Sequence, residues 1–132
     1  MKTNQEIVRS YYENLWNQQD KSYIDKLLGD EIVFRGSLGI ETKGKKEFES
    51  YFDMILAAIP NLYHGIERIV AQDDSLAAKV YYSGTQTGKL LDFEATHSRI
   101  RYNGASFFTM EEGKIVDIWV LGDLNALYQQ IK

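Results

Sequence analysis

The chain has 132 residues, 44% of them hydrophobic and 13% aromatic, and its formal charge is -4 at pH 7. This length and composition predict one domain, residues 1–132, with a packed core, and exclude a disordered chain. The acidic balance gives no electrostatic reason to expect a nucleic acid or an anionic membrane as partner, and the absence of cysteine excludes disulfides, thiolate catalysis and cysteine-ligated metals.

Neither a signal peptide nor a membrane-spanning segment is predicted. Residues 1–5 lack the apolar stretch of a signal peptide, and the longest uninterrupted apolar run, which includes residues 55–59, is far shorter than a membrane span. A helix needs about 20 apolar residues to cross a bilayer. We therefore expect a soluble, cytoplasmic protein.

Three helices are predicted in the first half of the chain. Residues 3–6 have the form of a capping box, and an apolar stripe at helical spacing predicts a helix over residues 4–17. Asp20 can cap a second helix whose apolar residues run to Leu28 and which Gly29 ends. After a strand at residues 31–35 and a loop at residues 36–44, a third helix carries apolar residues up to Ile59 and stops at Pro60.

The second half is predicted to consist mainly of strands, at residues 64–72, 75–85, 97–110 and 114–121. Turns at Asp73-Asp74 and at Glu111-Glu112-Gly113 separate two pairs of them, and a short helix begins at Asp123. Helices followed by consecutive strands predict an α+β fold, with a curved antiparallel sheet, about three N-terminal helices on its concave face and a short C-terminal helix.

Side-chain alternation predicts which residues of the terminal hairpin face the helices. In the strand at residues 97–110 the even positions are mostly apolar, so they are assigned to the inner face. Across the turn the inner face is predicted to continue through Val116, Ile118 and Val120. The outer face would then hold Ile115, Asp117, Trp119 and Leu121, joined by Phe107. Such an apolar outer face predicts a homodimer formed through it.

The terminal hairpin, residues 104–123, resembles the closing hairpin of the SnoaL-like polyketide and ester cyclases. These belong to the cone-shaped folds related to nuclear transport factor 2 and ketosteroid isomerase. Residues 11–20 are similar to the family's first-helix signature, in which a Trp-Asn pair, here Trp16-Asn17, precedes an Asp. Residues 58–62, 83–88 and 123–131 follow in the expected order, so the resemblance covers nearly the whole chain and implies a cone-shaped domain that dimerises through its sheet.

The resemblance also shows where this chain departs from the best-known cyclases. In those enzymes the proposed acid/base Asp directly follows the last-strand Trp, and a His lies on the adjacent strand. The matching residues here are Val120 and Ser106, so the usual Asp/His pair is absent. The carboxylate base of ketosteroid isomerase has no counterpart in residues 32–39, where the charged residue is Arg35.

Two charged residues are the candidate catalytic groups. Arg35 would bind a carboxylate, ester carbonyl or enolate oxygen, and Asp123 would act as base or orienter. A surface or ion-paired role remains open for Arg35, and an N-cap role for Asp123. The predicted substrate-binding residues, of which the aromatic ones could equally be core, are Tyr12, Trp16, Phe34, Ser37, Tyr102, Ser106, Ile118 and Val120.

No metal site or phosphate loop is predicted. His64 and His97 lack the spacing of a zinc or iron site, and Gly36, Gly39 and Gly44 lack the Lys-Ser/Thr ending of a phosphate loop.

The resemblance implies a small-molecule-binding domain with an apolar cavity and, if it is an enzyme, an ester or polyketide cyclase type. Such an enzyme would perform acid/base chemistry of the lyase or isomerase kind on a carbonyl-bearing apolar substrate, without a cofactor. Two alternatives remain open: a non-catalytic module that binds a hydrophobic metabolite, and a protein-interaction subunit of the same fold.

Overall fold

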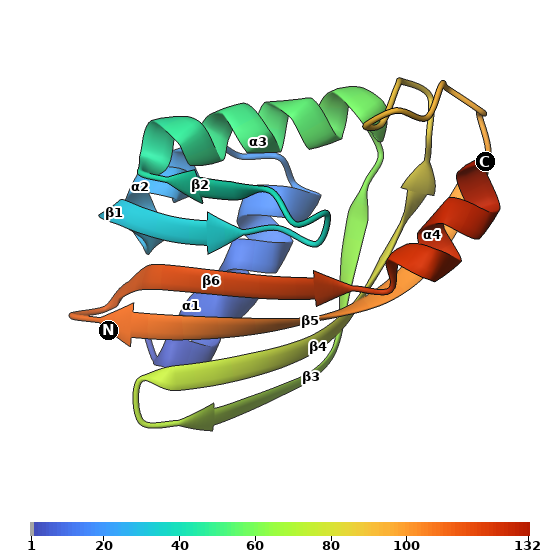
Figure 1. Ribbon diagram of the computed structural model, residues 1–132. Helices are drawn as coiled ribbons and strands as arrows, with labels where there is room; N and C mark the ends of the chain where they lie inside the picture. Colours follow the sequence, from blue (N-terminus) through green and yellow to red (C-terminus); the bar gives the residue numbers. More distant parts are fainter. Residues whose placement is uncertain (1) are drawn as a thin grey trace.

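The computed structural model describes residues 2–132 and consists of one curved six-stranded sheet with helices on its concave face (Figure 1). The strands are β1 (Leu28–Arg35), β2 (Glu41–Lys43), β3 (Tyr63–Gln72), β4 (Ser75–Thr85), β5 (Arg99–Glu111) and β6 (Lys114–Gly122). The helical segments are α1 (Asn4–Ser10), η1 (Tyr11–Asn17), α2 (Ser22–Leu27), α3 (Lys45–Ala58) and α4 (Leu124–Ile131). The predicted α+β fold class is confirmed.

The first helix has the predicted length but changes its winding halfway. Thr3 and Glu6 form the expected capping box, and α1 continues directly into η1, whose turns are of the wider π type. In η1 the neighbours Tyr11 and Tyr12 are both buried, with their rings edge to face at 5.2 Å. Short π segments often occur where a helix contributes to a functional site.

Two local predictions were wrong. Leu28 does not continue the second helix but opens β1, where it pairs with Ile115 of β6. The segment predicted as a loop contains the short strand β2, which pairs antiparallel with the end of β1. A three-residue edge strand is too short to show an alternation of its own.

The strand order is β2-β1-β6-β5-β4-β3, and every neighbouring pair is antiparallel except β1 and β6. Strands β3 to β6 therefore form a simple meander, and β1 lies parallel to its last strand. In Figure 1, α1 crosses behind β5 and β6, α3 lies beside β1 and β2, and α4 lies at the end of the hairpin. Among the described residues, no helix is long and apolar enough to cross a membrane.

The predicted facing of β6 was wrong at its beginning. Thr109 pairs with Asp117, but Met110 pairs with Ile115, so Val116 is the extra residue of a β-bulge. The bulge turns the fully buried Ile115 inward and Val116 outward, opposite to the prediction. Beyond the bulge the predicted alternation holds.

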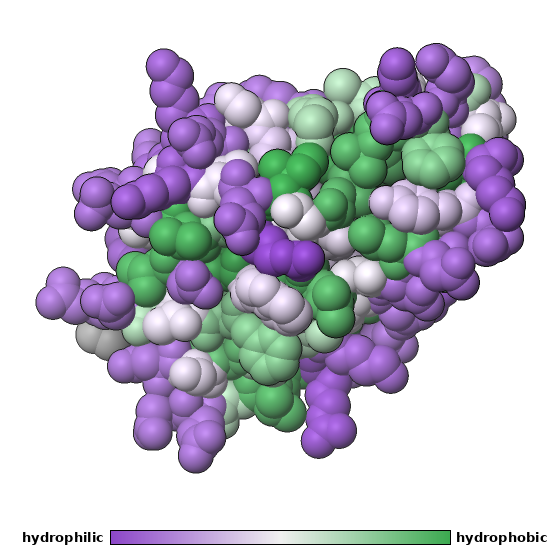
Figure 2. Space-filling model, in the orientation of Figure 1, coloured by the Kyte–Doolittle hydropathy of each residue, from purple (hydrophilic) through white to green (hydrophobic). Residues whose placement is uncertain are grey.

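The outer face of the sheet carries an apolar stripe, which we define by Phe107, Trp119 and Leu121. Their exposed fractions are 53%, 40% and 54%. Phe107 and Trp119 are paired across β5 and β6, and their ring centroids lie 6.0 Å apart. Figure 2, which views this side, shows hydrophobic side chains between charged ones over the middle of the sheet.

Candidate functional site

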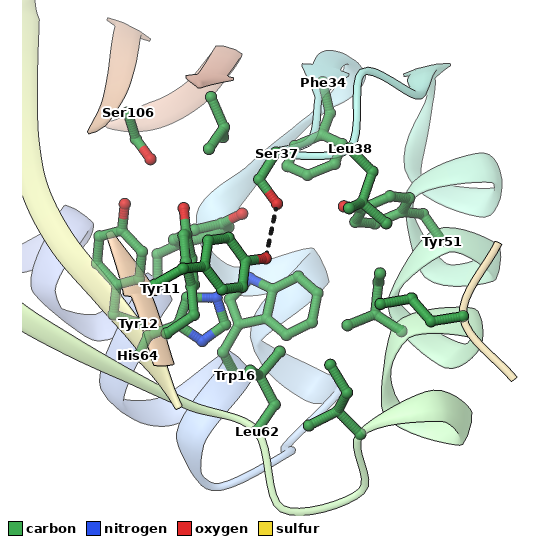
Figure 3. A pocket seen from close by; sticks show the side chains of 16 residues that line it. Tyr11, Tyr12, Trp16, Phe34, Ser37, Leu38, Tyr51, Leu62, His64 and Ser106 are labelled. Atoms are coloured by element: carbon green, nitrogen blue, oxygen red, sulfur yellow. Dashed lines mark hydrogen bonds between the residues drawn. The ribbon is translucent and has the colours of Figure 1, made fainter. Parts of the chain in front are cut away.

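A small aromatic cavity lies on the concave side, between η1, α3 and the strands (Figure 3). Its volume is about 40 Å³. By comparison, a cavity needs roughly 10 to 15 Å³ measured in this way to hold one water molecule. The lining residues are Tyr11, Tyr12, Trp16, Phe34, Ser37, Leu38, Tyr51, Ile55, Ile59, Leu62, His64, Tyr82, Leu90, Tyr102, Ser106 and Val120.

The sheet brings polar side chains into the cavity in register. His64 pairs with Tyr82, and Tyr82 pairs with Tyr102, so the three lie in one row across β3, β4 and β5. Further along β5, Ser106 lies directly opposite Val120 of β6. Ser37, from the loop after β1, lies 3.2 Å from the Tyr102 hydroxyl and completes this end of the cavity.

All the predicted substrate-binding residues except Ile118 line the cavity. Ile118 faces the same side of the sheet but is buried in the core, paired with Phe108. Ser106 and Val120 are both buried and both line the cavity.

Arg35 lies outside the cavity lining. Its guanidinium donates a hydrogen bond to the carbonyl oxygen of Val120 and lies over the ring of Trp119, 5.2 Å from the centroid. Trp119 belongs to the outer face, so Arg35 joins the end of β1 to β6 from that side. The neighbouring Phe34 points inward and lines the cavity, as expected for alternate residues of a strand.

Asp123 also lies outside the lining, at the start of α4. It is exposed, and its carboxylate accepts a hydrogen bond from the amide of Ala126 at 3.1 Å, which makes it the N-cap of this helix. The catalytic roles of Arg35 and Asp123 remain predictions, and the structure brings neither head group to the cavity.

The polar groups of the cavity wall are all uncharged. Among the described residues, no Asp, Glu, Lys or Arg side chain lines it. Burial raises the pKa of Tyr102 to about 12, with the Ser37 hydroxyl partly offsetting the rise. Burial likewise raises the pKa values of Tyr11, Tyr12, Tyr51 and Tyr82. The phenols therefore stay protonated and can donate hydrogen bonds.

His64 is one of nine lining residues that the sequence did not predict for the site; the others are Tyr11, Leu38, Tyr51, Ile55, Ile59, Leu62, Tyr82 and Leu90. Burial lowers the pKa of the His64 imidazole to about 3, so the ring is neutral near pH 7. Its centroid lies 4.9 Å from Trp16, 5.0 Å from Tyr82 and 5.5 Å from Tyr12. The Nδ1 atom of His64 and the hydroxyl of Tyr12 are enclosed and form no hydrogen bond with any described residue.

A second bulge explains why His64 points inward. Near the turn, Gln72 pairs with Ser75 and Arg68 with Lys79, a register that would place His64 opposite Ser83. The register shifts by one between Ile66 and Arg68, so His64 instead pairs with Tyr82 on the inner face. The sequence carries no clear signal for this shift.

Asn17, at the end of η1, fixes the backbone of His64. Its Oδ1 accepts a hydrogen bond from the His64 amide at 2.7 Å, and its Nδ2 donates one to the His64 carbonyl at 3.0 Å. The Trp-Asn pair of the first helix thus contacts His64 in two ways: the ring of Trp16 packs against the imidazole, and the carboxamide of Asn17 forms hydrogen bonds with the backbone.

No group of three or more His, Asp or Glu side chains within residues 2–132 is placed to hold a metal ion. The arrangement can enclose an uncharged molecule and donate hydrogen bonds to it from several hydroxyl groups.

Comparisons with known proteins agree with this geometry. A candidate SnoaL-like polyketide cyclase from Jannaschia sp. CCS1 superposes with a TM-score of 0.90 at 17% identity, over 97% of this chain and 90% of that one. IdmH, a candidate polyketide cyclase from Streptomyces antibioticus, gives a TM-score of 0.85 at 16% identity over 98% of both chains. AclR, a candidate hydroxylase from Streptomyces galilaeus, gives 0.81 at 21% identity, over 96% of this chain and 82% of that one.

At these identities the structures establish the fold. No curated protein matches the chain. The SnoaL-like polyketide cyclase profile matches residues 6–131, and the chain therefore belongs to the SnoaL-like polyketide cyclase family.

Proposed function

We propose that this protein is a cyclase-type small-molecule-binding domain that takes an uncharged, carbonyl-bearing organic molecule into its concave cavity. The observation that carries the proposal is the composition of the cavity wall: aromatic and aliphatic side chains, several hydroxyl groups and no charged side chain among the described residues. A charged ligand would lose its hydration there without gaining a counter-charge.

Binding requires the wall to move. Sites for organic ligands usually have volumes of about 300 to 1,000 Å³, whereas this cavity measures about 40 Å³. Leu38 and Leu90 line it from the loops between β1 and β2 and between β4 and β5, rather than from the helices or the sheet. We propose that these two loops move outward to admit the ligand.

The proposed chemistry is acid/base catalysis on the carbonyl group without a cofactor. Protonated phenols and serine hydroxyls along the wall could donate hydrogen bonds to a carbonyl oxygen as negative charge develops on it. With Ser106 and Val120 at the positions of the family's His and Asp, such chemistry would differ from that of the best-known cyclases. Arg35 and Asp123 could contribute only after moving toward the cavity mouth.

A second candidate is a non-catalytic module that binds a hydrophobic metabolite. The observation that favours it is the lack of a carboxylate or amine among the lining residues. Enzymes that move protons near neutral pH usually place such a group, or a histidine of suitable pKa, at the reacting atom.

The test uses the fluorescence of Trp16, which lines the cavity, and 1-tetralone as an uncharged ketone probe. The chain has two tryptophans, so Trp119→Phe leaves Trp16 as the only one. In this background we expect saturable quenching by 1-tetralone and none by 1,2,3,4-tetrahydro-1-naphthoate, a carboxylate with the same ring system.

The matched variant is Ser106→Leu, which fills the cavity from β5 and should weaken the binding of 1-tetralone roughly tenfold or more. Equal binding by Ser106→Leu, or no saturable quenching at all, would contradict the proposal. If no saturable quenching is seen, a protein-interaction role would be the remaining explanation for the fold. A rate of conversion of a bound ketone would decide between the enzyme and the binding module.

We also propose that two copies associate through the apolar stripe. Phe107, Trp119 and Leu121 form one exposed surface on neighbouring strands, and exposed hydrophobic surfaces of this kind are typical of interfaces.

A further inference from the structure

We propose that His64 contacts the ligand directly, through a hydrogen bond between a ring nitrogen of its neutral imidazole and a hydroxyl group of an uncharged ligand. Asn17 would act as its positioning residue. This inference rests on the proposed function and adds to it the polar contact and the group on the ligand that makes it.

The first argument is the unsatisfied hydrogen-bonding capacity of the ring. His64 is buried, with 6% of its surface exposed, and lines the cavity, yet its Nδ1 has no hydrogen-bond partner among the described residues. A buried polar atom without a partner is costly, and native proteins satisfy nearly all such atoms. The Tyr12 hydroxyl in the same cavity also forms no hydrogen bond of regular geometry, although the nearby Ser106 hydroxyl lowers the pKa of Tyr12 and offsets part of the rise that burial causes. A ligand group could satisfy these atoms without rebuilding the core.

The second argument concerns the kind of group that fits. A neutral imidazole has one nitrogen that donates and one that accepts. A hydroxyl group can do both, so it can pair with the unpartnered Nδ1 in either tautomer. A carboxylate would bring a charge into a wall that offers no cation, since no Lys or Arg among the described residues lines the cavity.

The third argument is that the ring is held in place. The rings of Tyr12, Trp16 and Tyr82 surround it, with centroids 4.9 to 5.5 Å away. Asn17 fixes the backbone on either side of the same residue. A rigid imidazole loses little freedom when it binds a ligand, which is the arrangement expected of a recognition group.

The experiment compares phenol with toluene, which has the same ring and no hydroxyl. Binding is measured for the wild type and for His64→Phe, which keeps a flat ring at this position and removes both nitrogens. We expect the dissociation constant of phenol to rise about fivefold or more in His64→Phe, while that of toluene stays the same or falls. Melting temperatures of both proteins show whether the variant is folded.

A second measurement needs no change at His64. The chain has two histidines, so ¹⁵N labelling of histidine gives two imidazoles, and His97→Asn assigns their signals. His97 is exposed, with a φ of 58° that asparagine tolerates. Phenol should shift the His64 nitrogens and toluene should not, with phenol binding unchanged in His97→Asn.

Asn17 is tested in the same way. Asn17→Ala should weaken phenol binding and shift the His64 nitrogens, and Asn17→Asp, which keeps the acceptor for the His64 amide, should restore part of both. If Asn17→Ala weakens toluene binding to the same extent as phenol binding, the positioning role is wrong.

The outcomes separate this inference from the proposed function. If wild type binds neither phenol nor toluene, the binding cavity itself is disproved, and the inference falls with it. If both bind but His64→Phe changes their affinities equally, or phenol leaves the His64 nitrogens unshifted, only the role of His64 is overturned.

Discussion

Asn17 joins the first helix to the edge of the sheet by hydrogen bonds to both backbone groups of a single residue, His64. β3 is an edge strand, so these two groups face away from β4 and have no strand partner. The side chain of Asn17 takes the place of the missing strand at this point.

Removal of this side chain should lower stability. Asn17→Ala leaves a part-buried amide and carbonyl without their partners, and we expect the free energy of unfolding to fall by about 1 to 3 kcal/mol. Urea denaturation measures it. Gln18→Ala is the control, because Gln18 is exposed and forms no side-chain hydrogen bond with a described residue. Equal stabilities of the two variants would contradict the role assigned to Asn17.

The burial of His64 predicts a pH dependence of stability. The pKa falls from the ordinary 6.5 to about 3 on folding, so between these values the unfolded chain binds one more proton than the folded protein. The free energy of unfolding should therefore fall as the pH drops below 6.5, by about 1.4 kcal/mol per unit from this residue.

His64→Phe isolates that contribution. The variant lacks the titrating group. The free energy of unfolding of His64→Phe minus that of the wild type, measured by urea denaturation, should therefore increase from pH 7 to pH 4. The exposed carboxylates titrate in both proteins and cancel in the difference. A difference that does not change with pH would show that His64 has the same pKa in the folded and the unfolded protein.

Trp119→Glu should disrupt the proposed dimer. A carboxylate at the centre of the apolar stripe would be buried without a partner in the interface. Light scattering at micromolar concentration should give a dimer for the wild type and a monomer for the variant. Met54→Glu, at an exposed hydrophobic residue on α3, is the matched control and should remain dimeric. A monomeric wild type would disprove the interface.

Asp123 is expected to act through its hydrogen bond to the start of α4. Asp123→Ala should cost about 0.5 to 2 kcal/mol of stability, whereas Asp123→Asn should cost little because an amide oxygen can still accept from Ala126. Thermal unfolding measures both. Once a reaction is known, a loss of turnover in Asp123→Asn at an unchanged melting temperature would restore Asp123 as a base.

Gly36 is needed because the ring of Tyr51 lies against its backbone. A Cβ at this position would overlap the Tyr51 hydroxyl and approach Phe34 Cε2 to 3.0 Å. Gly36→Ala should therefore lower the free energy of unfolding by about 1 to 3 kcal/mol.

Gly36→Ala should lower the free energy of unfolding by less when Tyr51 is first replaced by leucine, because the obstructing hydroxyl is gone. Urea denaturation of the single and double variants gives the coupling. Strictly additive losses would show that the two residues do not compete for space.

The sequence predicted the fold class, all the helices, every strand except β2, and seven of the sixteen residues that line the cavity. Helical spacing placed Tyr12 and Trp16 on one side of the first helix, and strand alternation placed Tyr102 and Ser106 on the inner face. These are local properties, because the period of a helix or strand is written in the residues that form it.

The tertiary structure alone decided the position of His64, the burial of Ile115 and the size of the cavity. Bulges at residues 66–68 and at Val116 shift the register by one, and each exchanges the inner and outer faces of its strand. A bulge depends on how two distant segments pair, and a cavity volume on how all the side chains pack together. Neither is encoded in the pattern of one segment, which is why the sequence did not predict that His64 lines the cavity.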